Sequence, residues 1–143
     1  MKINAISLVA ATLLAAPAFA QSASGDAAKG EKVFNQCQAC HVVAAPDGTV
    51  LAGRNGKVGP NLYGIPESKA AAVEGFKYSK GLHEAAEEGL VWNEENFVQY
   101  VQDPTKFLQE FTGDKKARAA MMFKIRKEED AQNVYAYLVS LVK

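Results

Sequence analysis

Apolar residues along the chain recur mostly at helical spacing, and the two clearest runs lie near its ends. Asp26 is a suitable N-cap for a first helix that ends near Cys37 and carries apolar residues on one side. Residues 128–142 begin with three acidic residues, which suit the positive end of a helix dipole. The apolar positions of this last segment fall on one helical face: Val134, Tyr137, Leu138, Leu141 and Val142.

Three shorter helices are predicted between these two. Ser79 and Asn93 are candidate N-caps for the first two of them, and the second must stop before Pro104. Asp103 and Pro104 then begin a third helix, since proline is favoured at the first helical position. Residues 42–75 are rich in Gly and Pro without sustained strand alternation, and we expect loops there. The pattern predicts a mainly α single domain, whose five modest helices and long loops wrap an apolar group that replaces missing core.

The amino-terminal residues are predicted to be an export signal rather than part of the fold. Lys2 precedes an apolar stretch over residues 3–16, and residues 18–20 form a small-residue cleavage pattern, A-x-A. A retained membrane anchor is the alternative, but the stretch is shorter than the roughly 20 apolar residues that cross a bilayer. We therefore expect residues 1–20 to be removed and residues 21–143 to form the domain.

The charge balance argues against one class of partner. The chain has 16 basic and 16 acidic side chains, and removal of the signal would take away a single lysine. A domain this close to neutral is not built to bind nucleic acid. Nothing after the signal is apolar enough to span a membrane, so we expect a soluble domain with no stable membrane insertion.

The two cysteines of the chain, Cys37 and Cys40, precede His41 in the pattern C-x-x-C-H. This pattern is the attachment signature of a c-type haem. Two thiols at this spacing add to the two vinyl groups of one porphyrin, which leaves the histidine under the iron as an axial ligand. Because thioether links do not dissociate, an exported protein retains the cofactor without a closed pocket. We therefore predict one covalently attached haem c per chain.

Three other uses of this motif agree less well with the sequence. A C-x-x-C redox disulfide normally lies beside a βαβ pattern, which is not visible in the sequence. A zinc site needs four ligands, yet His83 is the only other histidine and there is no third cysteine. A structural disulfide, usual in exported proteins, leaves His41 without a role.

The second axial ligand decides between an electron carrier and an enzyme. The candidates by donor atom are His83, Met121 and Met122. His83 lies among glutamates on a helix face that we expect to be solvated, which makes it a poor ligand. The two methionines lie in an irregular segment between helices, where a side chain can point at a cofactor, although methionine is usually flexible core filler.

Taken together, these residues resemble the class I cytochromes c, and among them the bacterial cytochrome c2 type, over essentially all of residues 25–142. Besides C-x-x-C-H, the resemblance rests on motifs that occur in the family's order. They are Gly30 and Phe34 with Tyr137, the Gly59-Pro60-Asn61-Leu62 loop, Phe76 with Tyr78, Trp92, Tyr100 and the segment around Met121. The resemblance implies that the first helix contacts the last one at Tyr137.

The resemblance also implies roles for the residues of the haem pocket. Pro60 packs on the histidine and accepts a hydrogen bond from its imidazole N–H, which makes the ring a better donor. Tyr78 lies in a loop beneath the haem propionates, and Trp92 donates its indole N–H to a propionate. Tyr100 lies near the methionine sulfur.

The family register places the axial methionine at Met121, with Met122, one position away, as the alternative. One departure from the family pattern lies in the loop after Asn61. Ser68 stands where the family often has an arginine that holds a propionate. Lys69 is an imperfect substitute, because an ammonium is a point charge and not a planar fork.

His/Met ligation favours ferrous iron and raises the reduction potential, and two permanent ligands leave no open site on the iron. We therefore predict a soluble single-haem electron carrier that acts by outer-sphere transfer and is not an enzyme. The resemblance implies a periplasmic monomer that takes part in photosynthesis or respiration. Its partners would be a cytochrome bc complex as donor and a reaction centre, terminal oxidase or reductase as acceptor.

Charged residues are unevenly distributed, which predicts how such partners are met. Residues 115–127 include six basic side chains and no acid, whereas acids concentrate within residues 84–95. The resulting dipole would orient the protein toward an acidic docking patch, with Lys115, Lys116 and Lys124 as the docking residues. A solvated basic loop without a docking role is the alternative.

Two other functions stay open at this point. A haem enzyme or gas-binding protein would have a vacant or labile sixth position and an acid–base residue such as His83 near the iron. The second is a haem domain that acts only as a fixed subunit of a larger complex.

Overall fold

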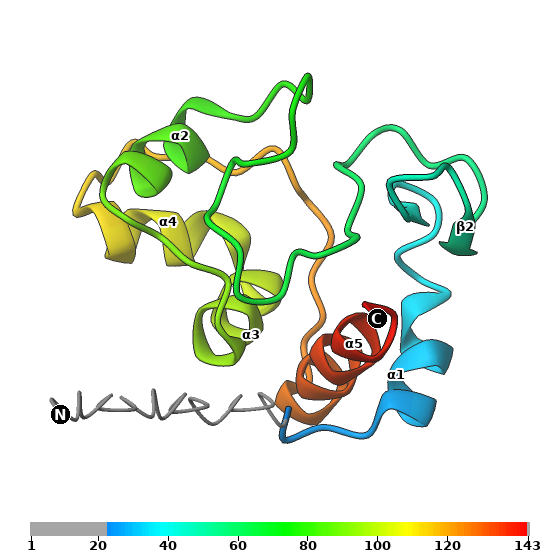
Figure 1. Cartoon of the computed structure of the whole chain (residues 1–143). Coiled ribbons are helices and arrows are strands. Elements are labelled where there is room, and N and C mark those ends of the chain that lie inside the picture. The colour runs from blue at the N-terminus through cyan, green and yellow to red at the C-terminus, as the bar shows by residue number, and fades with distance from the viewer. Residues whose placement is uncertain (1–22, 143) are drawn as a thin grey trace, which may run out of the picture.

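The computed structural model describes residues 23–142, which form five helices and one small antiparallel sheet (Figure 1). The helices are α1 (Ala27–Phe34), α2 (Lys80–Glu87), α3 (Glu94–Gln102), α4 (Pro104–Thr112) and α5 (Glu128–Ser140), and the strands are β1 (Val43–Ala44) and β2 (Val50–Ala52). The predicted mainly α fold with five helices is confirmed. The predicted export signal, residues 1–20, lies outside the described residues. In the part that the structure describes, no helix is long and apolar enough to cross a bilayer.

Three helices begin at the side chains predicted as caps, and α4 is capped by Asp103, which was predicted as part of a helix start but not as a cap. Asp26, Ser79, Asn93 and Asp103 each accept a hydrogen bond from the backbone N–H three residues further on, at 3.0, 3.3, 2.8 and 3.3 Å. These bonds satisfy N–H groups that a helix start otherwise leaves without a partner. The last helix, α5, has no side-chain cap and instead carries three acids in its first turn, which favour the helix dipole.

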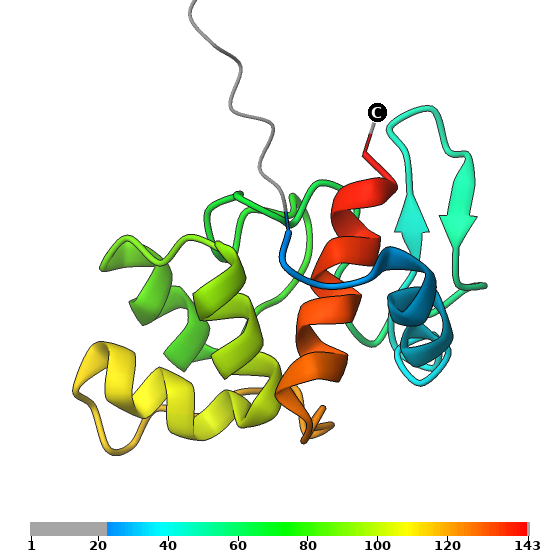
Figure 2. The same ribbon diagram turned by 90° about the horizontal axis from the view of Figure 1, so that it is seen from below.

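The first and last helices pack against each other on one side of the molecule (Figures 1 and 2). Gly30 is buried at this crossing, where a Cβ atom would overlap the carbonyl oxygen of Asn133. One turn further along, the rings of Phe34 and Tyr137 lie 5.5 Å apart. The contact implied by the resemblance between α1 and α5 is therefore confirmed.

The three middle helices form the other side of the molecule. Helix α4 packs against both α2 and α3, and α3 also contacts α5, which joins the two sides. The core of this half includes Leu90, Trp92, Phe107 and Leu108, all of them buried. The loops before α2 and before α5 run between the two halves (Figure 1), and they bound the cavity described below.

One element was not predicted, a short β hairpin within the segment expected to be all loop. Val43 pairs with Ala52 and Ala44 with Val50, with an irregularity between the two pairs. The strands have two and three residues, which is too short for an apolar–polar alternation to appear in the sequence. Their connection turns at Gly48, whose φ of 87° lies in the left-handed region that glycine favours.

Candidate haem-binding site

The C-x-x-C-H residues follow directly from α1. After Phe34 the chain continues in turns, in which Cys37 N–H donates to the Phe34 carbonyl at 2.8 Å. The N–H groups of Cys40 and His41 both donate to the Cys37 carbonyl, at 3.1 and 2.9 Å. One tight turn therefore holds the two thiols and the imidazole close together at the end of a helix that is itself fixed against α5.

The orientation of His41 is set by the next loop. Its Nδ1 lies 2.9 Å from the carbonyl oxygen of Pro60, an acceptor only, so Nδ1 carries the proton and Nε2 keeps a free lone pair. Gly59 lies against the flat imidazole, where a Cβ atom would overlap the ring. Burial lowers the pKa of His41, and the Pro60 bond only partly opposes this shift. The ring is therefore neutral at pH 7 and has the tautomer that a metal ligand needs.

A cavity of about 390 Å³ opens beside this turn. Every haem-pocket and axial-ligand residue proposed from the sequence lines it: Cys37, Cys40, His41, Pro60, Tyr78, Trp92, Tyr100, Met121 and Met122. The rest of its lining is largely aliphatic and aromatic, and among the described residues no acid, lysine or arginine lines it. The cavity thus suits a flat apolar group, with paired thiols and one neutral imidazole at its edge.

The thiol of Cys37 is in an environment that keeps it protonated. Burial, with a smaller contribution from Cys40, raises the pKa of Cys37 to about 11. A thiol with this pKa hardly ionises at neutral pH. It is therefore a poor nucleophile for disulfide exchange and a poor metal ligand, because both roles need the thiolate. Over residues 23–142 no cluster of three or more His, Cys, Asp or Glu side chains could hold a metal ion, which counts against the zinc alternative.

The two methionines differ in their surroundings. Met121 is partly buried and packs against the hydrophobic core that includes Phe34 and Tyr137. Met122 is 84% exposed, although part of it reaches the rim of the cavity. His83, the third candidate, is exposed on α2 with its ring 5.9 Å from that of Tyr78, and it does not line the cavity.

Three aromatic residues of the predicted pocket share one core cluster, to which Trp92 belongs and against which Tyr78 and Tyr100 pack. Trp92 is 7% exposed, and its ring centroid lies 4.9 Å from that of Tyr100. Burial raises the pKa of Tyr100 to about 12, so its hydroxyl stays protonated. Tyr78 accepts a hydrogen bond from Val73 N–H at 3.1 Å, which leaves its own hydroxyl proton available to another acceptor.

The departure at Ser68 has a local structural explanation. Its hydroxyl donates to the Ile65 carbonyl at 2.7 Å, so the side chain closes a turn. Lys69 forms an isolated bridge with Val91, and its side chain is exposed. Neither residue lines the cavity.

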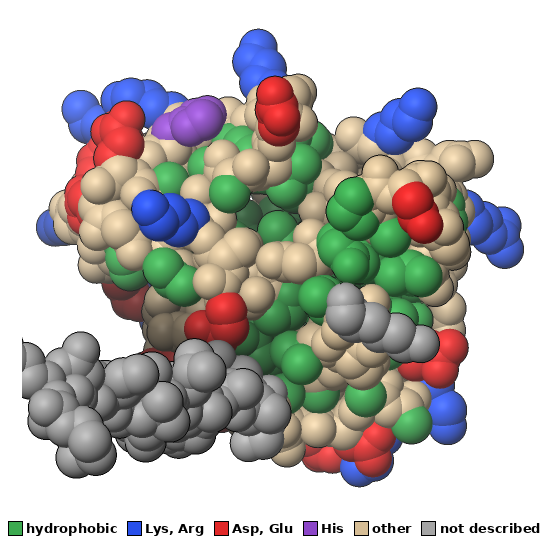
Figure 3. All heavy atoms as spheres, viewed as in Figure 1, with side chains coloured by type: hydrophobic (Ala, Val, Ile, Leu, Met, Phe, Trp, Pro, Cys, Tyr) green, Lys and Arg blue, Asp and Glu red, His purple; other side chains and the backbone are tan. Residues whose placement is uncertain are grey.

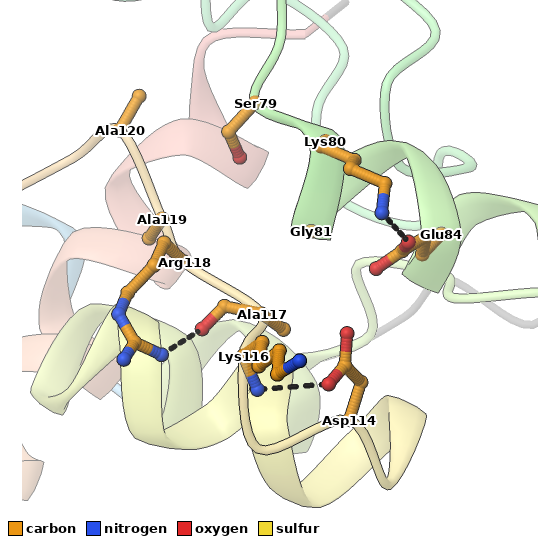
Figure 4. A pocket seen from close by; sticks show the side chains of 10 residues that line it. All are labelled: Ser79, Lys80, Gly81, Glu84, Asp114, Lys116, Ala117, Arg118, Ala119 and Ala120. Atoms are coloured by element: carbon orange, nitrogen blue, oxygen red, sulfur yellow. Dashed lines mark hydrogen bonds and ion pairs between the residues drawn. The ribbon is translucent and has the colours of Figure 1, made fainter.

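The predicted docking lysines are all exposed, but their charges are not equally free. Lys124 Nζ lies 2.7 Å from Asp103 Oδ2. Within the described range, neither Lys115 nor Lys116 forms an ion pair. Lys116 lines a second hollow of about 260 Å³ between the start of α2 and residues 114–120 (Figure 4).

Sequence reasoning missed Val58 and Phe123 at the mouth of the cavity, and it proposed Met122 only as an alternative ligand. Val58, Met122 and Phe123 line it while being 76%, 84% and 42% exposed, so they form an apolar rim. On the face shown in Figure 3, hydrophobic side chains gather around a hollowed centre, and most Lys and Arg side chains stand toward the periphery. Apolar residues next to a basic segment were the available signal in the sequence for this rim. In a loop, however, no periodicity shows which apolar residues are exposed.

The fold and the site together define a small helical protein with a largely apolar cavity, suited to a flat cofactor, beside a C-x-x-C-H turn. The family model "Cytochrome c" matches residues 27–142. Cytochrome c2 of Rhodovulum adriaticum is 59% identical over 118 residues, which are 82% of this chain and 94% of that protein. Cytochrome c-550 of Paracoccus versutus is 51% identical over 140 residues, covering 96% of this chain and 88% of that protein.

A solved structure of cytochrome c2 from Rhodobacter sphaeroides is similar in fold, with a TM-score of 0.82 and 55% identity. The match covers 84% of this chain and 99% of the chain in that structure. The chain belongs to the cytochrome c family, and its similarities are to the cytochrome c2 type. Its cofactor is accordingly haem c, for which Cys37 and Cys40 have the attachment spacing.

Proposed function

We propose that the protein is a single-haem electron carrier in which Cys37 and Cys40 hold haem c by thioether bonds. His41 and Met121 are the proposed axial ligands. The observation that carries this proposal is one apolar cavity lined by both thiols, by a neutral imidazole and by a partly buried methionine. Haem c, when bound, supplies one-electron exchange between ferric and ferrous iron.

The surrounding residues are suited to tune and protect that exchange. The Pro60 carbonyl holds the Nδ1 proton of His41, which orients the ring and strengthens Nε2 as a donor. A thioether ligand at Met121 and an apolar lining both favour the less charged ferrous state, which raises the potential. Two protein ligands leave no position for oxygen or peroxide, so we propose a carrier and not an enzyme.

Met121 is preferred to Met122 because of burial. An axial ligand must leave water and point into the cavity, and Met121 already packs against the core next to it. Met122 would have to withdraw a side chain that is 84% exposed. For the pocket aromatics we propose that the free hydroxyl proton of Tyr78 and the indole N–H of Trp92 face the haem propionates, with Tyr100 near the Met121 sulfur.

Docking is proposed to occur at the mouth of the cavity, where the apolar rim lies beside the basic segment. A partner with an acidic patch would be attracted by Lys115 and Lys116 and would then contact apolar residues close to the haem. Lys124 would contribute less, because Asp103 partly neutralises it. The proposed partners are a cytochrome bc complex and a reaction centre, terminal oxidase or reductase.

The cellular setting belongs to the same proposal. We infer export by the signal in residues 1–20 and a monomeric domain of residues 21–143 in the periplasm, where it would serve photosynthetic or respiratory electron transfer. Several similar proteins are cytochromes c2, which supports a carrier of this kind.

The experiment that tests the function is an absorption spectrum of the purified holoprotein, oxidised and reduced, with and without carbon monoxide. We expect sharp reduced bands, a weak far-red methionine-to-ferric band and no response to carbon monoxide. High-spin ferric bands or a prompt carbon monoxide shift would instead favour the haem enzyme or gas-binding alternative. Gel filtration of the native extract separates a free carrier from a fixed subunit of a larger complex.

A further inference from the structure

Glu67 adopts a backbone conformation that is unusual for its residue type. Its φ is +64°, in the left-handed region that side chains with a Cβ atom rarely enter. Its N–H donates to the Trp92 carbonyl at 2.9 Å, and Trp92 N–H donates to the Ser68 carbonyl at 2.8 Å. Strain of this kind persists only where the surroundings hold the residue in place. The loop of residues 65–68 is thus fixed to Trp92 by two backbone hydrogen bonds.

A side chain from the last helix holds the same two residues. The hydroxyl of Tyr135 donates to Glu67 Oε1 at 2.6 Å and lies 3.3 Å from the Trp92 carbonyl oxygen. Tyr135 is 1% exposed, and its ring lies 5.3 Å from that of Phe97. A hydroxyl bound to a carboxylate forms one of the stronger hydrogen bonds of a protein. The carboxylate of Glu67 therefore anchors the strained loop to α5.

This anchor lies directly behind the cavity. Ile65, Trp92 and Phe97 all line the cavity, whereas Tyr135 and Glu67 do not. Tyr135 therefore contacts three segments of the cavity lining from its outer side: the 65–68 loop, the backbone of Trp92 and the ring of Phe97. A change in this contact would move cavity residues without removing any of them.

We propose that Tyr135 and Glu67 are a positioning pair that fixes Trp92 and the 65–68 loop against the cavity, and thereby keeps water from it. This inference deepens the proposed electron-carrier function and rests on it for one of its two readouts. With the pair broken, the lining would loosen, water would enter, and the more charged ferric state would gain stability. The reduction potential would therefore fall.

The test compares holoprotein variants that differ in one hydrogen bond. Tyr135→Phe removes the donor and keeps the ring, and Tyr137→Phe, on the same helix but against Phe34, is the matched control. Glu67→Gly removes the acceptor and suits the left-handed backbone, whereas Glu67→Gln keeps an acceptor oxygen. The readouts are the reduction potential by spectroelectrochemical titration and the near-ultraviolet circular dichroism of Trp92, the single tryptophan of the chain.

We expect Tyr135→Phe and Glu67→Gly to lower the potential and to weaken the Trp92 signal, and their combination to add little, because both break one interaction. Tyr137→Phe and Glu67→Gln should stay close to the wild type in both readouts. Equal behaviour of Tyr135→Phe and Tyr137→Phe would overturn the proposal. If Tyr135→Phe does not give folded holoprotein, the Glu67 variants decide: no difference between Gly and Gln overturns it as well.

Failure of this inference differs from failure of the proposed function. A wild-type protein that binds carbon monoxide would refute the closed carrier, yet the Trp92 signal of the variants would still report on the pair. A wild-type protein with the expected carrier spectrum, but with variants that leave both readouts unchanged, would refute only the positioning role.

Discussion

Gly30 of α1 and Asn133 of α5 touch backbone to backbone where the two helices cross. The space next to Gly30 is occupied by the Asn133 carbonyl group, and Tyr137 Cβ would lie 2.8 Å from an added Cβ. The Asn133 side chain also accepts a hydrogen bond from Asp26 N–H at 2.7 Å, so it fastens the start of α1. Since α1 leads directly into the Cys37 turn, this crossing fixes one edge of the haem site.

Gly30→Ala should therefore destabilise the protein although alanine is the better helix former. The intrinsic gain is about 1 kcal/mol, whereas overpacking against a backbone that cannot yield costs about 1–3 kcal/mol and at times more. Because the added Cβ would overlap a backbone carbonyl, we expect the upper end of this difference, a net loss of up to roughly 2 kcal/mol in the free energy of unfolding, measured by denaturant titration. Ala28→Gly, at an exposed position of the same helix, is the control for propensity alone. If Gly30→Ala were as stable as the wild type, α1 and α5 would be able to move apart enough to fit the methyl group without a loss in the free energy of unfolding.

The sequence predicted the helices well because their signals are local. Side-chain caps, a proline at a helix start and a periodic apolar face each operate within a few residues. All three predicted caps form, and α4 begins at Pro104 as predicted. The β hairpin was missed because strands of two and three residues are too short to show an apolar–polar alternation. The irregular segment around Met121 follows no period at all, so its placement depended on a resemblance.

The ligand assignment predicts different outcomes for the two adjacent methionines. Met121→Leu should abolish the far-red methionine-to-ferric band and make the ferrous iron reactive to carbon monoxide, because leucine has no donor atom. Met122→Leu should retain the band and stay unreactive, since its side chain is 84% exposed. Absorption spectra of both variants test this. Loss of the band in Met122→Leu alone would transfer the ligand role to Met122.

Gly59 predicts a second effect on ligation. In Gly59→Ala the new methyl group would overlap the His41 ring, which must then turn away from the Pro60 carbonyl. We expect a loss of about 1–3 kcal/mol in the free energy of unfolding together with an altered ferric spectrum. Gly64→Ala is the control, because Gly64 has a φ of 69° with no neighbouring atom in the way. That control should lose stability through backbone strain while its spectrum stays unchanged.

The site was predictable where chemistry has a short-range signature and not where it depends on shape. C-x-x-C-H identifies Cys37, Cys40 and His41 by spacing alone. The apolar rim at Val58 and Phe123 comes from two distant loops, which only the folded chain brings to one cavity. In the same way, the pairing of Lys124 with Asp103 joins residues 21 positions apart, and a count of basic residues does not reveal it.

The docking lysines should differ in their effect on association. Replacement of Lys115 and Lys116 by glutamine should lower the rate of electron exchange with an acidic partner, such as a purified cytochrome bc complex, by roughly tenfold at low ionic strength. The dependence of that rate on salt should weaken as well. Lys124→Gln should have a smaller effect, because Asp103 already neutralises part of its charge. Stopped-flow rates measured across a salt series distinguish these cases, and equal effects of all three lysines would contradict the ordering.

The pairing of Asp103 with Lys124 also predicts how stability depends on pH. The hydrogen bond from Lys124, followed by that from Lys106 N–H, lowers the pKa of Asp103. A carboxyl group whose pKa is lower in the folded state stabilises the fold above its unfolded pKa, and this contribution is lost as pH falls through the folded pKa. Asp103→Asn keeps an oxygen that can cap α4 but removes the charge. We therefore expect the wild type to be more stable than Asp103→Asn at pH 7, with a gap that closes as the pH falls below about 4.

Denaturant titrations of both proteins across this pH range measure the gap directly. Added salt should narrow it at neutral pH, because both partners of the pair are well exposed to solvent. In a Lys124→Gln background, Asp103→Asn should lower the free energy of unfolding by less, because the hydrogen bond from Lys124 is the principal cause of the shift in the Asp103 pKa. A gap that stays constant from neutral to acidic pH would show that the substitution acts through the capping geometry of the new amide and not through the loss of charge.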